Sequence, residues 1–211
     1  MASRLSNILR QRYIQAFGHP WAEEAMAISN GTGASFTQRL SLQDFKLPAT
    51  LLQLAATAGS SILGLVSGTH GSASPLLVGN AASGNSKSDS ARICIAVSPF
   101  YAAGATVTLR IRAKATVGLA FAATTVDTLV YRSDLAAGVS SDLCTTNAQT
   151  ITTSAANYDF TLTPTSMNPG DILDILVTAL ANDTGGTTGT IIQIYNVELI
   201  YGSKNVSDLP T

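Results

Sequence analysis

The sequence predicts an all-β protein: an antiparallel β-sandwich preceded by a short helical N-terminal arm. Three observations lead to this fold class. Several segments after residue 49 alternate apolar and polar side chains with a period of two, turn residues separate them, and no helical period lies between them. We therefore expect residues 1–48 to form the arm, a short helix followed by an extended linker, and residues 49–211 to form the sandwich.

The arm is predicted from a four-residue period near the N-terminus. Four apolar side chains would share one helix face: Leu5, Leu9, Tyr13 and Phe17. Gly18 and Pro20 then end the helix, because glycine accepts the left-handed conformation and proline cannot continue a helix. A helix of about 15 residues is marginal alone in water, so this face needs a partner.

The strands of the sandwich differ in how clearly they are marked. Alternation is strictest over residues 106–115, which predicts a half-buried strand of an antiparallel sheet. The same period marks three further segments: 93–97, 158–162 and 173–179. Residues 190–201 also alternate, but their apolar parity switches near Asn196, which predicts a β-bulge. Residues 67–90 are rich in glycine, serine, alanine and asparagine, and we expect a long surface loop there.

The composition points to a protein whose surface is covered by other subunits. Charged residues make up 12% of the chain, about half the usual share of roughly 25%, and none lies between Lys46 and Lys87. Weakly charged apolar surface usually marks an interface, so we expect a homo-oligomer. The net charge of −1 does not favour nucleic acid or an anionic membrane surface as the partner.

The residues that could carry catalysis are few and scattered. The two histidines, His19 and His70, offer neither metal-ligand spacing nor an obvious general base. Asp171 and Asp174 are near neighbours, but Asp171 follows Pro-Gly and is more simply a turn residue. We therefore expect no enzyme activity, no cofactor and no metal, with a sandwich-fold glycan lyase or hydrolase as a remote alternative.

The two cysteines are expected to be free thiols. Cys94 lies inside an apolar run, so we expect it to be a small buried side chain. Cys144 is the second cysteine of the chain. Because no secretory signal is visible, we expect folding in a reducing compartment, where disulfides are rare.

A row of cations is the one charged feature of the predicted strands. Arg110, Arg112 and Lys114 would share the polar face of residues 106–115. They form either an ordinary solvated face or a contact for an acidic partner, and together with the four apolar arm residues they are our candidate interface. Aromatic residues, at 6%, are scarce for a sugar-binding platform, so the sequence lends a carbohydrate-binding role no support.

The C-terminal half carries a family resemblance. Residues 168–179, the Asn-Asp-Thr-Gly-Gly segment that begins at Asn182, and residues 191–201 resemble jelly-roll proteins of tailed-bacteriophage particles, the capsid cement or decoration proteins among them. The resemblance covers roughly residues 90–202 in style and rests on no diagnostic motif. It implies a jelly roll, often trimeric, that binds the major capsid protein and stabilises the head of a virion assembled in the host cytoplasm. The alternative within the virion is a host-recognition module of a tail fibre or base plate that binds glycans.

Overall fold

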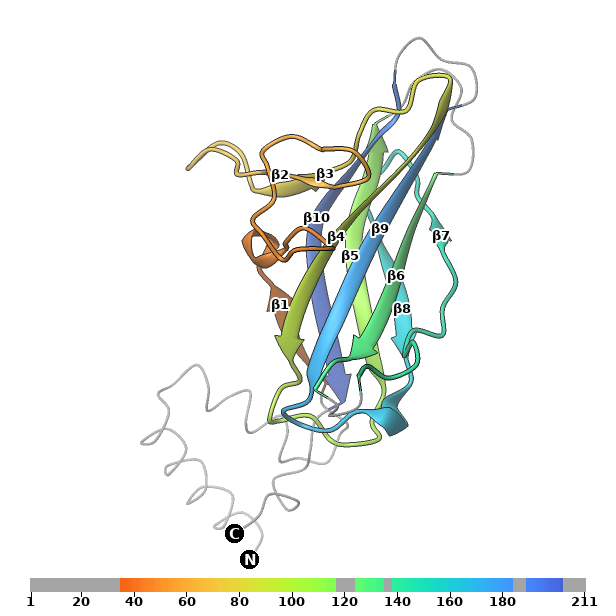
Figure 1. The fold of residues 1–211 in the computed structure, drawn as a ribbon. Helices are drawn as coiled ribbons and strands as arrows, with labels where there is room; N and C mark the ends of the chain where they lie inside the picture. The colour runs from red at the N-terminus through yellow and green to blue at the C-terminus, as the bar shows by residue number, and fades with distance from the viewer. Residues whose placement is uncertain (1–34, 117–123, 135–137, 184–188, 203–211) are drawn as a thin grey trace, which may run out of the picture.

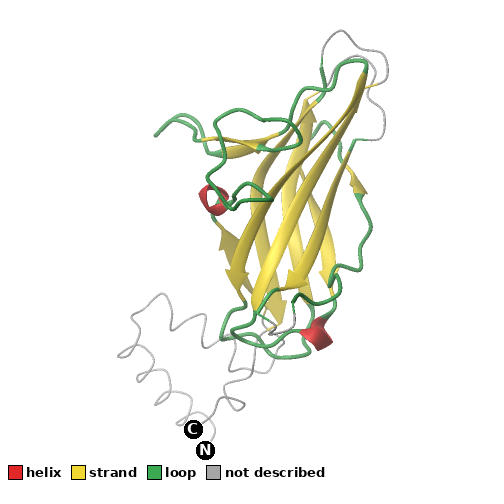
Figure 2. Ribbon diagram, in the orientation of Figure 1, coloured by secondary structure: helices red, strands yellow, loops and turns green. Residues whose placement is uncertain are grey.

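The computed structural model describes residues 35–116, 124–134, 138–183 and 189–202, which form two antiparallel β-sheets packed face to face (Figures 1 and 2). One sheet has six strands in the order β2-β3-β10-β5-β8, with β1 on the same edge of β10 as β3. Its strands are β1 (Ser35–Leu40), β2 (Gly64–Val66), β3 (Leu76–Val78), β5 (Val107–Thr116), β8 (Ala156–Leu162) and β10 (Ile191–Gly202). The predicted antiparallel β-sandwich is confirmed.

The second sheet has four strands in the order β4-β9-β6-β7. These are β4 (Asn85–Ala96), β6 (Thr125–Arg132), β7 (Gln149–Thr150) and β9 (Ile172–Asp183). Two single-turn 3-10 helices, η1 (Leu42–Asp44) and η2 (Pro164–Ser166), lie outside the sheets (Figure 2). None of the helices in the described ranges is both long and apolar enough to span a membrane.

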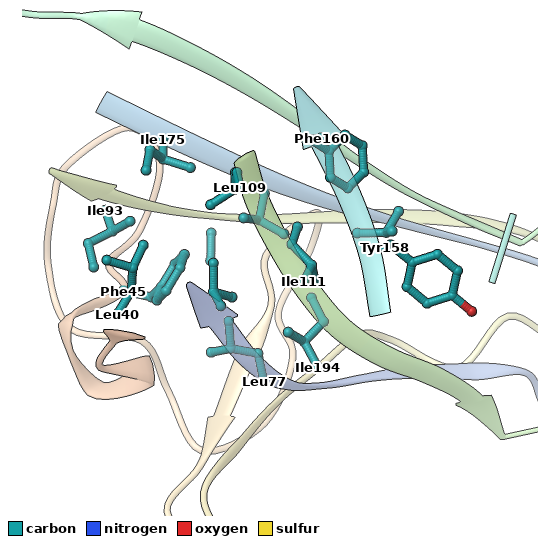
Figure 3. Packing of buried hydrophobic residues seen from close by; sticks show 14 of the residues in the cluster. Leu40, Phe45, Leu77, Ile93, Leu109, Ile111, Tyr158, Phe160, Ile175 and Ile194 are labelled. Carbon is teal, nitrogen blue, oxygen red and sulfur yellow. The ribbon is translucent and has the colours of Figure 1, made fainter. Parts of the chain in front are cut away.

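The hydrophobic core lies between the two sheets and is built from the alternating faces of their strands. Leu109 and Ile111 of β5 are fully buried, and Ile93 and Ile175 of the opposite sheet belong to the same cluster (Figure 3). Full burial of one such side chain stabilises the fold by about 1.5–3 kcal/mol. A register slip of one residue would turn every one of these side chains outward, so the core also determines which residues of β5 face solvent.

The bulge predicted near Asn196 is present in β10. The pairing of β10 with β5 shifts between Ile194 and Asn196, so that β10 has one residue more than its partner. Ile194 and Val197 are both fully buried, and Tyr195 and Asn196 lie between them in partly exposed positions. The bulge therefore lets both ends of β10 contribute to the core while two consecutive residues face outward.

Residues 35–48 correct the expected linker. β1 pairs along its whole length with Val197–Gly202 of β10, and Leu40, Leu42 and Phe45 are buried in the core. Residues 35–48 therefore belong to the sandwich and not to a linker. The segment shows no clear period because it joins one short strand to a 3-10 turn. The predicted arm helix, with Leu5, Leu9, Tyr13 and Phe17, falls outside the described residues.

The long loop expected at residues 67–90 is also corrected. This segment contains β3 and the first half of β4. Only residues 67–75 and 79–84 lie outside these strands. Asn85–Ser88 are exposed on both faces of the strand, so no alternation marks them, yet they pair with Leu180–Asp183 of β9. Backbone pairing with β9 extends β4 there, together with a hydrogen bond from the Ser86 hydroxyl to the Asn182 side chain at 3.0 Å. In Figure 1, β2 and β3 form a small hairpin at one side of the sandwich.

Candidate functional site

The predicted row of cations lies on the outer face of the six-stranded sheet, along its strand β5. Arg110 and Lys114 are partly exposed, Arg112 is exposed, and the residues between them are fully buried. The alternation read from the sequence therefore places all three side chains outward, as predicted. Their surroundings differ, because β10 and β8 bring different neighbours to each.

Arg110 is held by a carboxylate of the same chain. Its Nε and one terminal nitrogen donate to the two carboxylate oxygens of Asp159 on β8, both at 2.7 Å. This hydrogen-bonded pair lowers the pKa of the Asp159 carboxyl and raises the pKa of Arg110. On the other side of Arg110, Glu198 of β10 stands in register with it. Arg39 of β1 is in register with Glu198 in turn, and its Nε lies 4.0 Å from a carboxylate oxygen of Glu198. Across four strands, the charges therefore alternate in sign and sum to zero: Arg39, Glu198, Arg110 and Asp159.

Lys114 lies against the bulge. Its Nζ is 5.7 Å from the centroid of the Tyr195 ring, a cation–π arrangement. The Tyr195 hydroxyl donates to Oε1 of Gln193 at 2.6 Å, and Gln193 is in register with Lys114. The bulge thus brings a phenol ring, an amide and an ammonium group together on the open face of the sheet.

Arg112 occupies a row without carboxylates. Asn196 of β10 and Asn157 of β8 stand in register with it on either side. Asn196 donates from Nδ2 to Glu198 at 2.9 Å, and Asn157 is exposed. Within the part of the chain that the structure describes, no acidic side chain forms an ion pair with Arg112. Its guanidinium is therefore open to a ligand, with two amide side chains beside it.

We refer to these outward residues as the bulge face: Asn157, Arg112, Lys114, Gln193, Tyr195 and Asn196. It offers an aromatic ring bordered by hydrogen-bond donors and acceptors, a composition suited to binding a polar ligand. Reasoning from the sequence missed Tyr195, because it considered the overall aromatic content and not the positions of single aromatic residues. The available signal was the parity switch, which places two adjacent residues on one face.

The acidic residues considered for catalysis are already engaged. Asp174 accepts from Nε of Arg92 at 2.6 Å and also pairs with a second nitrogen of that guanidinium. Asp171 accepts from the backbone N–H of Asn168 at 2.7 Å, which confirms its turn role, and pairs with Arg132 at 3.3 Å. Across the described ranges, no group of three or more histidine, cysteine or acidic side chains is placed to hold a metal ion.

The remaining single residues fit no shared site. His70 is exposed in the loop between β2 and β3, and His19 lies outside the described residues. Cys94 corrects the expectation of a buried thiol: it is exposed on the outer face of β4, since its neighbours Ile93 and Ile95 take the inward positions. Cys144 is partly buried; both thiols are free, and desolvation raises the pKa of each.

Comparison with known proteins yields likenesses of structure only. No family model matches the chain, and no curated protein matches it. A carbohydrate-binding module in complex with β-1,4-galactotriose is 11% identical, with 78% of this chain and 86% of that chain covered and a TM-score of 0.38. The xylan-binding domain from Paenibacillus barcinonensis is 11% identical, with coverage of 68% and 82% and a TM-score of 0.39.

A structure from a bacteriophage is similar to the same degree. The enzymatically active domain of tailspike protein 4 of bacteriophage CBA120 is 12% identical, with a TM-score of 0.37. The alignment covers 81% of this chain but only 20% of that one. These likenesses describe the sandwich and do not identify a ligand for this chain.

Proposed function

We propose that this chain is a non-catalytic glycan-binding β-sandwich module that binds its ligand on the bulge face. The observation that carries the proposal is the bulge itself, which turns Tyr195 and Asn196 outward together beside Arg112, Lys114 and Gln193. A pyranose ring has an apolar C–H face and a rim of hydroxyl groups. The bulge face has the matching composition, an amphipathic aromatic ring with hydrogen-bonding side chains around it.

The contact between Lys114 and Tyr195 does not close the site. A cation–π contact at an exposed position contributes only about 0.5–1 kcal/mol, and a lysine stem is flexible. A sugar that stacks on the ring can therefore displace the ammonium group at small cost. The hydrogen bond from Tyr195 to Gln193 meanwhile restrains the ring, so less conformational entropy is lost on binding.

A glycan array with the purified full chain, followed by titration of the best-bound glycan, tests this function. Tyr195→Ala should weaken binding at least tenfold. Tyr131→Ala is the matched control, because Tyr131 is a partly exposed tyrosine of β6 in the opposite sheet. We expect the control to bind as the wild type does. An array without a bound glycan, or equal binding by wild type and Tyr195→Ala, would overturn the proposal.

The assignment to a virion follows from the resemblance to tailed-bacteriophage proteins and belongs to the proposal. In that setting a glycan-binding module fits a host-recognition role in a tail fibre or base plate.

The second candidate function is that of a cement protein, in which the chain packs on the major capsid protein. A different surface favours it. On the outer face of the four-stranded sheet, Leu129 is 37% exposed and stands in register with Leu176.

That leucine pair supports self-association more directly than the cationic row does, because Arg110 is already paired with Asp159. For this second candidate we expect a homo-oligomer, a trimer in the capsid setting. Light scattering at micromolar concentration should give a multiple of 21.8 kDa. The single change Leu129→Asp should shift that mass toward the monomer, while Thr125→Asp on the same strand serves as its control. A wild-type monomer would remove support for the cement reading and leave glycan binding intact.

A further inference from the structure

The two sheets differ in charge although the whole chain is nearly neutral. The strands of the six-stranded sheet carry four cationic side chains and two carboxylates, a net charge of +2: Arg39, Arg110, Arg112, Lys114, Asp159 and Glu198. The strands of the four-stranded sheet carry three cations and four carboxylates: Lys87, Arg92, Arg132, Asp89, Asp127, Asp174 and Asp183. Positive charge is therefore concentrated on the sheet that holds the bulge face.

Within that sheet the excess charge is localised. Arg39 and Arg110 alternate with Glu198 and Asp159 in one neutral row. The two remaining cations, Arg112 and Lys114, both belong to the bulge face. Lys114 is directed at the Tyr195 ring, which leaves Arg112 as the exposed cation between two uncharged amides.

We infer that the glycan bound at the bulge face is acidic, a sugar carrying a carboxylate such as a uronic or sialic acid, and that Arg112 binds this carboxylate. The inference rests on the proposed function. A planar guanidinium matches a planar carboxylate with two parallel hydrogen bonds. Asn157 and Asn196 can donate to the same oxygens or to neighbouring hydroxyl groups. Neighbouring strands are about 4.8 Å apart, so a ligand on Tyr195 reaches Arg112 within the width of one pyranose.

Two matched pairs of probes test the charge preference. Sialyllactose is compared with lactose, and an oligogalacturonate is compared with its methyl ester, which is the same chain without the charge. We expect the wild type to bind the acidic member of at least one pair five times or more as tightly. Arg112→Gln should abolish this preference, so that the ratio of the affinities for the acidic and the neutral member falls to about one.

Controls separate a specific site from the general field of the sheet. Arg39→Gln removes the same charge from the same sheet, and Arg39 is 83% exposed, so this variant should keep the preference. Equal loss in both variants would assign the effect to long-range charge and overturn the role of Arg112. A sulfated oligosaccharide is the third probe, and tighter binding of sulfate than of carboxylate would overturn the carboxylate assignment.

The failures of the two proposals are distinguishable. Binding that depends on Tyr195 but ignores charge would refute the acidic ligand and leave glycan binding standing. If the wild type bound neither member of either pair nor any glycan of the array, the glycan-binding proposal would fail, and the acidic ligand with it.

Discussion

Asp89 is a buried carboxylate whose removal should destabilise the sandwich and loosen the support of the bulge face. It lies on β4 with its side chain pointing into the core, and only 2% of it is exposed. Its two oxygens accept the backbone N–H of Asn80 at 2.6 Å and the Asn80 side-chain amide at 2.7 Å. The same amide donates to the carbonyl of Gly59. One carboxylate of the four-stranded sheet thus anchors the chain that follows β3 in the other sheet.

The size of the effect follows from these contacts. A hydrogen bond to a charged group contributes about 1.5–3 kcal/mol, and a buried donor left without an acceptor costs about 1–3 kcal/mol. The variant also avoids the free-energy cost of burying a charge, and this offsets part of the loss. We therefore expect Asp89→Ala to lower the free energy of unfolding by about 2–4 kcal/mol, since the broken contacts outweigh the relieved burial. For a chain of this size the melting temperature should fall by roughly 5–15 °C.

Urea and thermal unfolding of the full chain, followed by circular dichroism, measure this change. Asp89→Asn keeps one acceptor oxygen and should lie between the wild type and Asp89→Ala. Asp44→Ala is the control, because Asp44 is exposed in η1, and its unfolding free energy should change by less than about 0.5 kcal/mol. If Asp89→Ala matched the wild type within that margin, the carboxylate would not be the anchor described.

Two further predictions test the domain boundary and the charged row. Phe45→Ala should cost about 3–5 kcal/mol, because this fully buried ring belongs to the core and not to a linker, and a loss below 1 kcal/mol in urea unfolding would restore the original boundary. The depressed pKa of Asp159 stabilises the fold above its unfolded pKa near 4, and this contribution disappears as the pH falls through the lower folded value. Since that carboxylate is 46% exposed, Asp159→Asn should reduce the stability difference between pH 7 and pH 2 by only about 0.5 kcal/mol, and a reduction above 2 kcal/mol would contradict its exposure.

Alternation of apolar residues was enough to predict β5, β8, β9, β10 and even the bulge, but β6 was not predicted. β5 and β9 are half buried with regular parity, and the parity switch near Asn196 marks the extra residue in β10. β2 and β3 have three residues each, too few to establish a period. The start of β4, Asn85–Ser88, also escaped prediction, because its side chains are exposed on both faces and show no alternation.

The candidate site was predicted only in part, because its meaning depends on pairing between distant strands. The sequence places Arg110, Arg112 and Lys114 on one face, and the structure confirms this. Nothing near these residues in the chain shows that Asp159 binds the first of them, or that Tyr195 lies beside the last. Those neighbours come from β8 and β10, which are 49 and more residues further along the chain.

The ion pair of Arg110 with Asp159 has a consequence for its neighbour Arg112. Two residues apart on the same face of a strand, the two guanidinium groups would be about 6.6 Å apart. Two like charges at this separation repel by about 0.6 kcal/mol in water and by about 2.5 kcal/mol at an effective dielectric constant of 20. Asp159 lies only 2.7 Å from Arg110 and offsets most of this repulsion. The sheet can therefore hold Arg112 without a counter-ion of its own, which is the state in which a guanidinium is free to bind an anionic ligand.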